Sequence, residues 1–355
     1  MALFGIKYGY SSCDTRYRRD WYSLTPSEQM LYISGFQKLR KNGKLNDITS
    51  TYSRLSSLNK FQDTSLFFFV NQHLVHQFED AIRSLGNEYE CFSMPYWDFT
   101  NEYERVNLGE DVPNIFQTGL GGFGDPNDAW KVNEYSWDVT TQEFWSPDHN
   151  FVCTASNDAC PICSVKRDGT DTDFNHLQSA NYYGTQIIDL SDFISFQQWM
   201  VSDVGLPHSI DNSYDPIWYL FHSFESYMQG MWVNCNDYDL IDINVDLYNH
   251  PEAFSPYCDP DDDHIDMTND DCVGIDLDDD LYFNGLLPKR GWSYIHENQL
   301  NIKMLYSLPK WNVIYDLNDD DFFIKSGLSQ QCKNKINKEW FILPNNNNNN
   351  YNGYQ

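Results

Sequence analysis

The chain has 355 residues, 41% of them hydrophobic and 16% aromatic, which is enough to bury a sizeable core. Asp and Glu number 52 against 23 Lys and Arg, so the formal net charge is -29. Such an acidic surface argues against a nucleic-acid partner, and the lack of an apolar run of about 20 residues argues against a transmembrane segment.

The first predicted helix starts at residues 25–28 (TPSE), which combine an N-cap Thr, a Pro at the first helical position and the Glu of a capping box. The Asn-Gly pair at 42–43 is expected to end this helix. A weaker helical pattern covers 46–58, and a third helix is predicted from about Asp63 to Gly86.

Residues 100–185 are rich in Gly, Asn, Asp and aromatics without a sustained period, which predicts long loops with short elements. Helical patterns return at 190–200 and at 214–233. Mixed short elements are expected after the acidic stretch at 259–280, and the Asn-rich tail at 344–355 is predicted to be disordered.

Nine cysteines are scattered along the chain, at positions 13, 91, 153, 160, 163, 235, 258, 272 and 332. Only Cys160 and Cys163 form a close pair, whereas a four-cysteine zinc site needs two such pairs. The pattern favours disulfide bonds, which are typical of secreted proteins, and the odd count leaves one thiol over. We therefore predict an extracellular or secretory-pathway protein, although no signal peptide is visible in this chain.

The third predicted helix carries one polar residue, Asn71, on its core-facing row, whose other members are Phe67, Val75, Phe78, Ile82 and Leu85. An amide in that position needs hydrogen bonds, because an unsatisfied one costs about 1–3 kcal/mol. His73 and His76 are spaced like a metal-binding pair, but they lie roughly 200° and 140° around the helix from Asn71. We interpret both as surface or packing histidines.

Three segments, in this order along residues 13–240, resemble tyrosinases and related type 3 copper proteins. They are the upstream run CDTRYRRDWYSLTPSEQMLYISGFQKL, the pair FEDAIRSLG and YECFSMPYWDF, and the run YDPIWYLFHSFESYMQGMWVNCNDYD at 214–239. The resemblance implies a mainly α fold with a four-helix-bundle core, long aromatic-rich loops and few short strands. It also suggests a core domain at 1–240, an acidic extension packed on or wrapping the core at 241–343, and the tail at 344–355.

The resemblance further implies six copper-binding histidines, three for each of two metals that bind O2 between them. Carried onto this chain, the six positions are Tyr52, Gln62, Asn71, Phe196, Met200 and His222, so five of the six are not histidine. Shifting the second site by one residue gives Gln197 and Val201, which are not histidines either. The acidic residue often found one turn after the last histidine falls at Ser226.

We therefore expect a non-catalytic, tyrosinase-like pseudoenzyme with a structural, assembly or binding role, without a cofactor. Protein partners or self-assembly would fit such a role. The alternative is a copper-dependent phenol oxidase whose rebuilt site uses His208 and His222, with Met200 as a further donor. Against it, two histidines cannot supply three imidazoles to each of two coppers.

Three smaller expectations complete the sequence reading. The stretch at 259–280 contains eleven Asp, and Asp261, Asp262 and Asp263 are candidate ligands for a weak calcium site, although an EF-hand pattern is lacking. Residues 95–98 (PYWD) are interpreted as a turn that buries two aromatics while Asp98 fixes the backbone. In the implied fold the N-terminal segment returns beside the end of the third helix, so Cys13 and Cys91 are candidates for a disulfide.

Overall fold

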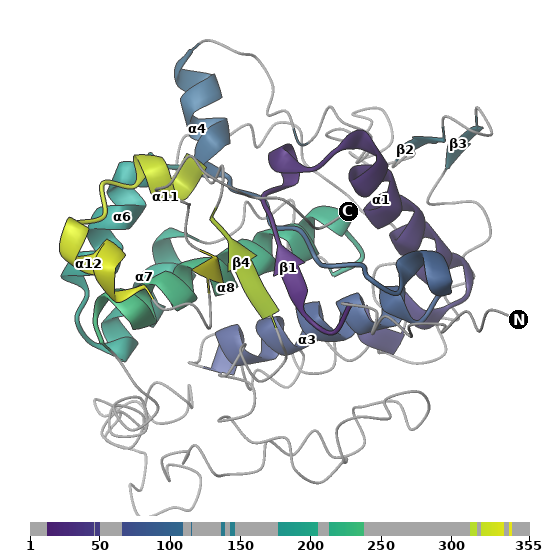
Figure 1. Cartoon of the computed structure of the whole chain (residues 1–355), viewed down its shortest axis with the longest axis horizontal. Helices are drawn as coiled ribbons and strands as arrows, with labels where there is room; N and C mark the ends of the chain where they lie inside the picture. The colour runs from purple at the N-terminus through teal and green to yellow at the C-terminus, as the bar shows by residue number, and fades with distance from the viewer. Residues whose placement is uncertain are drawn as a thin grey trace, which may run out of the picture.

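A long buried helix, α8 (Pro216–Cys235), forms the centre of the fold (Figure 1). All 20 of its residues are buried, and Asp215 caps its first turn by accepting a hydrogen bond of 2.8 Å from the backbone N–H of Ile217. The predicted helix at 214–233 is therefore confirmed, displaced by two residues. The computed structural model describes residues 13–45, 47–49, 66–108, 115, 136–138, 143–145, 177–204, 213–237, 313–317, 321–336 and 341–342.

The first helix, α1 (Pro26–Lys41), has the predicted start and end. Thr25 and Glu28 form the expected capping box, and Gly43 leaves the helix with a φ of 81°, a conformation that favours glycine. The third predicted helix is α3 (Leu66–Arg83), which packs against both α1 and α8. Most of the weaker helical prediction at 46–58 lies outside the described residues.

The predicted helix at 190–200 is wrong at its start, because two helices meet near that point. The first, α6 (Ala180–Asp189), occupies a region predicted to be loop, and Leu190 is its C-cap. The second, α7 (Phe193–Asp203), starts after Asp192, whose carboxylate accepts a hydrogen bond of 2.8 Å from the backbone of Ser195. The Asp192 N-cap therefore resets the helix, and α6 packs against α8 independently.

Shorter elements lie around these helices, and those after residue 100 fall where the sequence predicted short elements. They are η1 (Trp21–Ser23), η2 (Asn87–Tyr89), α4 (Thr100–Asn107), α11 (Asp321–Lys325) and α12 (Gln330–Lys335). The last two are drawn in yellow beside α6 and α7 in Figure 1. Gly184 allows the chain after α11 to approach α6, since a Cβ at this position would lie 1.9 Å from the carbonyl oxygen of Ser326.

Two small sheets complete the described structure. In the first, β1 (Arg16–Arg18), β4 (Val313–Asp316) and β5 (Phe341–Ile342) pair in parallel in that order. In the second, β2 (Ser136–Asp138) and β3 (Glu143–Trp145) are antiparallel. The first sheet joins residues near the two ends of the sequence, so the described part of the predicted C-terminal extension contacts the N-terminal segment. The domain boundary near 240 stays a prediction.

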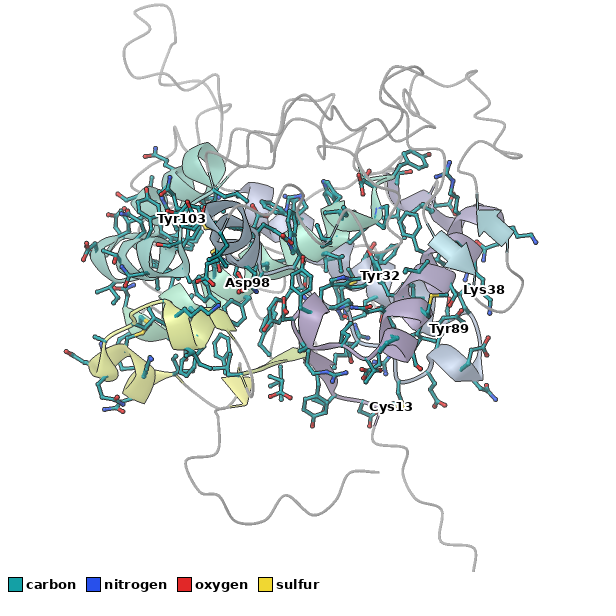
Figure 2. All side chains as sticks on the ribbon, turned by 90° about the horizontal axis from the view of Figure 1, so that it is seen from above. Cys13, Tyr32, Lys38, Tyr89, Asp98 and Tyr103 are labelled. Carbon is teal, nitrogen blue, oxygen red and sulfur yellow. A yellow bond between two sulfur atoms is a disulfide. The ribbon has the colours of Figure 1, made fainter. Side chains whose placement is uncertain are left out.

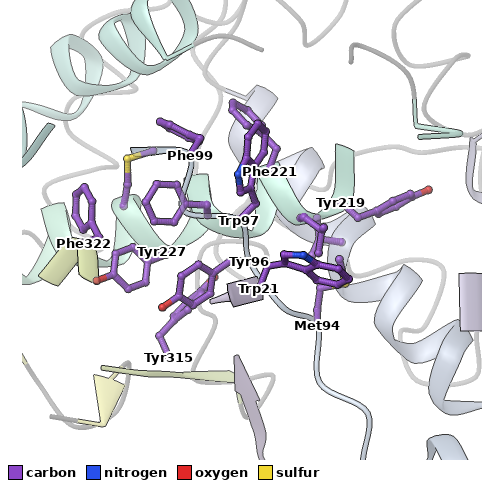
Figure 3. Close-up of a cluster of buried hydrophobic side chains, with 14 of the residues drawn as sticks. Trp21, Met94, Tyr96, Trp97, Phe99, Tyr219, Phe221, Tyr227, Tyr315 and Phe322 are labelled. Atoms are coloured by element: carbon purple, nitrogen blue, oxygen red, sulfur yellow. The ribbon is translucent and has the colours of Figure 1, made fainter. Parts of the chain in front are cut away.

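The predicted turn at 95–98 is wrong, because Tyr96 makes a parallel β-bridge with Asp20, in which its backbone N–H donates to Arg19 at 3.0 Å and its carbonyl accepts from Trp21 at 2.7 Å. The aromatic side chains of this segment enter the core, as predicted (Figure 3). The ring of Tyr96 lies 5.2 Å from that of Tyr227 and 5.7 Å from that of Tyr315. Trp97 donates from its indole nitrogen to Glu102 at 3.1 Å, and its backbone N–H donates to the carbonyl of Leu220 at 3.0 Å. This motif thus attaches the chain to α8 and serves the core.

Asp98 fixes the backbone at the start of α4, as predicted (Figure 2). Its carboxylate accepts hydrogen bonds from the backbone N–H of Thr100 at 3.0 Å and from the amide of Asn101 at 3.1 Å. Because these bonds satisfy donors in the first turn, we expect Asp98→Ala to lower the free energy of unfolding by about 1–2 kcal/mol. Urea titration would measure the change. Asp98→Asn, which keeps one acceptor, should lose less, and equal losses in both variants would contradict this role.

Two disulfides connect distant parts of the described chain. The predicted bond between Cys13 and Cys91 is present, and a second, which the sequence did not indicate, joins Cys235 to Cys332. The second bond links the C-terminal end of α8 to α12. Among the described residues, no helix is both long enough and apolar enough to cross a membrane.

Candidate functional site

Asn71 lies on the face of α3 that packs against α8. It shares this row with Val75, Phe78 and Ile82, and all four side chains are at most 1% exposed. Neither the oxygen nor the nitrogen of the Asn71 amide has a hydrogen-bond partner among the residues that the structure describes. The predicted inward position is therefore confirmed, but the hydrogen bonds expected for a buried amide are not found there.

Helices α3 and α8 run antiparallel beside one another (Figure 1). The ring of Phe78 on α3 stacks on that of Tyr219 on α8 at 3.9 Å. Gln72, six residues before Phe78, donates from its amide to Gln229, which lies ten residues after Tyr219. This register brings Asn71 to the level of the second half of α8.

His222 is the one histidine among the six positions implied by the resemblance, and it is 1% exposed. Its Nδ1 is hydrogen-bonded to the carboxylate of Glu225, and its ring lies 4.1 Å from that of Trp218. The sequence analysis sought an acidic partner at Ser226 and overlooked Glu225, although a spacing of three residues also puts two side chains on one helix face. Ser226 instead donates from its hydroxyl to the carbonyl of His222 at 3.0 Å.

Phe196 and Met200 on α7 are completely buried. The ring of Phe196 stacks on that of Trp232 at 4.7 Å and also contacts Trp199. Trp232 lies ten residues beyond His222 on α8, a rise of about 15 Å along the helix. The contact of Phe196 with α8 is thus at the C-terminal part of that helix, where its ring packs against an aromatic neighbour.

The comparisons with known proteins bear on these positions. The tyrosinase-like protein phomQ1' of Diaporthe leptostromiformis is 24% identical over 246 residues, which cover 61% of this chain and 62% of the relative. The tyrosinase-like protein phomQ1 of the same organism is 30% identical over 120 residues, which cover 32% of this chain and 29% of the relative. This chain is a distant relative of tyrosinase-like proteins.

The match spans less than two thirds of the length of either tyrosinase-like relative, so their activities and partners are not transferred to this chain as findings. No protein-family model matches the sequence. The comparisons thus support the resemblance seen in the motifs and leave the state of the copper positions to be argued from the residues themselves.

At the described positions that the resemblance implies for copper ligands, the side chains do not have the chemistry that a pair of coppers needs. An amide, a phenyl ring and a thioether stand at Asn71, Phe196 and Met200, where copper of this type takes imidazole. Within the described ranges, no three His, Cys, Asp or Glu side chains are grouped closely enough to hold a metal. Tyr52, Gln62, His208 and the candidate calcium ligands Asp261, Asp262 and Asp263 lie outside the described residues.

His73 and His76 are packing histidines, since both are buried, with exposures of 1% and 7%. Burial, with a smaller contribution from His76, lowers the pKa of His73 to about 3, so its ring is neutral at physiological pH. His73 is hydrogen-bonded to Gln77, and the Nδ1 of His76 lies 2.6 Å from the guanidinium of Arg16. Each ring thus contacts a different neighbour, and the pair shares no ligand in these contacts.

Glu79 on α3 is a buried carboxylate that the sequence analysis did not single out. Its carboxylate pairs with the guanidinium of Arg18 at 3.0 Å, and both side chains are 0% exposed. Arg16 approaches the same oxygen at 3.3 Å, and the backbone N–H of Met94 donates to the other oxygen at 2.6 Å. Burial alone would raise the pKa of Glu79, but the charge of Arg18 and its neighbours holds it well below the usual range.

Arg18 extends this network to the C-terminal part of the chain. It donates to the hydroxyl of Tyr315 on β4 at 3.3 Å, and that hydroxyl donates to the carbonyl of Ser223 on α8 at 2.9 Å. The guanidinium therefore joins β1, α3 and β4, with α8 as the next contact. This network thus connects the N-terminal strand β1, helix α3 and the C-terminal strand β4 to α8.

Proposed function

We propose that this protein is a non-catalytic, tyrosinase-like pseudoenzyme with a structural, assembly or binding role. The observation that carries the proposal is the set of residues at the implied copper positions, of which only His222 is a histidine. Phe196 supports it further, because its ring is stacked on Trp232 as a packing residue. The proposal includes a four-helix-bundle core, built from α3, α7, α8 and the helix predicted at 46–58.

We further propose an extracellular location for the pseudoenzyme. The disulfides Cys13–Cys91 and Cys235–Cys332 support it, because such bonds persist in oxidising compartments. The net charge of -29 favours solubility and cationic partners over anionic ones. Weak calcium binding by the acidic stretch at 259–280 is compatible with that setting, and calorimetry with Ca2+ tests it directly.

The second candidate function is a copper-dependent phenol oxidase with a rebuilt site. The contact between His222 and Glu225 favours it, because a carboxylate on one ring nitrogen is a frequent support for a histidine that binds metal through the other. Copper would supply oxygen activation in such an enzyme. The described donors near His222 do not complete its ligand set, so we rank this function second.

Copper content distinguishes the two functions. We expect purified protein, incubated with Cu2+ and then dialysed, to retain far less than one copper per chain by mass spectrometry. The same preparation should take up no oxygen with a catechol. His222→Leu is the matched variant, since it removes the one imidazole at the implied positions. Two coppers per wild-type chain that are lost in His222→Leu would overturn the proposal, whereas equal traces in both proteins would indicate adventitious binding and support it.

A further inference from the structure

Residues 14–19, which include β1 and which we call the strap, lie beside α3 and are anchored at both ends (Figure 1). At one end, the preceding Cys13 is disulfide-bonded to Cys91. At the other, the backbone N–H of Tyr96 donates to the carbonyl of Arg19 at 3.0 Å, and its own carbonyl accepts from Trp21 at 2.7 Å. A segment held at both ends can loosen in its middle and close again without losing its place.

Arg16 fixes the middle of the strap to α3. Its guanidinium donates to the Nδ1 of His76 at 2.6 Å and to the carboxylate of Glu79 at 3.3 Å, and it also donates to the carboxylate of Asp80. These three residues are spaced by three and four, so they lie on one face of the helix. One cation of the strap is thus shared by an imidazole and two carboxylates of α3.

The contact between Arg16 and His76 requires a neutral imidazole. A guanidinium carries only donors, so the ring nitrogen must accept through its lone pair. Burial, with a smaller contribution from Arg16, lowers the pKa of His76 below its ordinary value of 6.5, although Glu79 and Asp80 act in the opposite direction. The ring is therefore neutral at neutral pH, and protonation would place a second positive charge beside Arg16.

A protonated His76 would find the partners of Arg16 within its own reach. Its Nδ1 lies 3.7 Å from the carboxylate of Glu79, and its Nε2 lies 3.7 Å from that of Asp80. Glu79 remains ionised in mild acid, because its pKa is held well below the usual range. The side chain of Asp80 is 47% exposed, so protons from solvent can reach this cluster.

The charged and titratable groups around His76 come from the strap and from α3. In the part of the chain that the structure describes, they are Arg16, Arg18, His73, Glu79, Asp80 and Arg83. The pKa of His73 is about 3, so this ring stays neutral near pH 5. Arg18 pairs with Glu79 and Arg83 donates to the carbonyl of Cys13, and neither contact involves His76. Loss of the Arg16 contact would therefore loosen the strap locally.

We propose that His76 is an acid-sensitive latch, which holds the strap on α3 at neutral pH and, once protonated, displaces Arg16 from Glu79 and Asp80. The strap would thus open in an acidic environment and close again on neutralisation. The inference goes beyond the proposed function and is independent of it, because His76 is not one of the implied copper positions.

The direction of the pH dependence follows from the lowered pKa of His76. The ring binds its proton less readily in the closed, folded state than in the unfolded chain, so the contribution of the latch is fully present above about pH 6.5. It is lost as the pH falls through the lower pKa of the folded state. The contribution of Glu79 is lost only below about pH 4.5, so measurements at pH 5 separate the two groups.

The test is hydrogen–deuterium exchange of the full chain at pH 7 and pH 5, read by mass spectrometry and corrected for the intrinsic dependence of amide exchange on pH. We expect peptides covering residues 14–19 to lose protection by at least about tenfold at pH 5, as the loss of one charged hydrogen bond implies. Peptides from α8 should keep their protection. Unchanged protection of the strap at pH 5, or an equal loss in α8, would overturn the inference.

Variants assign the effect to the latch. His76→Gln keeps an acceptor for Arg16 but cannot bind a proton, so its strap should stay protected at both pH values. His73→Gln is the matched control, because His73 is bonded to Gln77 on its own helix, and it should respond to acid as the wild type does. An acid response that persists in His76→Gln, or that disappears in His73→Gln, would contradict the assignment.

Arg16→Gln tests the same contact from the strap if His76→Gln does not fold. It removes the cation that joins the strap to α3, so the strap should exchange rapidly at both pH 7 and pH 5. A strap that remains protected in Arg16→Gln at neutral pH would overturn the inference.

Discussion

Glu79→Gln is expected to lower the free energy of unfolding by about 3–5 kcal/mol, the usual cost of removing one partner from a buried ion pair. The amide keeps the shape and can still accept from Met94, but it leaves the guanidinium of Arg18 buried without its carboxylate. Arg18 cannot release its proton at ordinary pH, so its charge must remain. Equilibrium unfolding in urea at neutral pH measures the loss.

The matched control is Glu88→Gln. Glu88 pairs with Lys38 at 2.9 Å, and both side chains are about half exposed. Figure 2 labels Lys38 beside Tyr89. Exposed pairs contribute little to stability, so we expect no measurable change in unfolding. A loss in Glu79→Gln as small as that in Glu88→Gln would show that water reaches Arg18.

The same carboxylate predicts the direction of the pH dependence. The pKa of Glu79 is lower in the folded protein than its ordinary value of 4.5, so below that value the unfolded chain binds more protons. Its contribution to stability is therefore fully present above about pH 4.5 and is lost progressively as the pH falls below it. Glu79→Gln should show a correspondingly weaker dependence on pH in this acid range.

Local signals predicted the parts of the fold that depend on neighbouring residues. The bounds of α1 followed from Thr25, Glu28 and Gly43, since caps and glycine act within one turn. The burial of Tyr96 and Trp97 and the backbone contact of Asp98 were likewise predicted, whereas the turn was not found, because a bridge between Tyr96 and the distant Asp20 holds this segment. Where the bounds and caps were predicted, the residues that decide the structure are adjacent in the sequence.

Contacts between distant residues were beyond the reach of such signals. Arg18 and Glu79 are buried because β1, α3 and β4 assemble around them, and neither residue is unusual in its own segment. The disulfide between Cys235 and Cys332 could not be chosen among nine cysteines without knowing that α12 packs against α8.

The candidate site was predicted in part. The inward position of Asn71 followed from helical periodicity, and burial confirms it. The hydrogen bond between Gln72 and Gln229 required the register between two helices, which no single stretch of sequence specifies. Because the two residues belong to different helices, their contact appears only in the folded structure.

The largest covalent effect should come from the Cys235–Cys332 disulfide. The bond closes a loop with a sequence separation of 97, and chain entropy for a loop of that size contributes about 4–5 kcal/mol. We expect Cys235→Ser with Cys332→Ser to lower the free energy of unfolding by about that amount in urea titrations. Without the disulfide, only noncovalent contacts would join α12 to the C-terminal end of α8, among them the ion pair between Lys335 and Asp237 at 2.6 Å.

The Cys13–Cys91 disulfide provides the matched comparison, since its sequence separation of 78 predicts nearly the same entropic contribution. Replacing Cys13 and Cys91 by Ser should therefore cost about as much as replacing the other pair, because loop closure grows only slowly with length. Unchanged unfolding in either double variant would mean that this bond does not constrain the unfolded chain. Because each bond should supply a large share of the 5–15 kcal/mol typical of folded proteins, we expect reducing conditions to unfold a large fraction of the chain, as the proposed extracellular location would require.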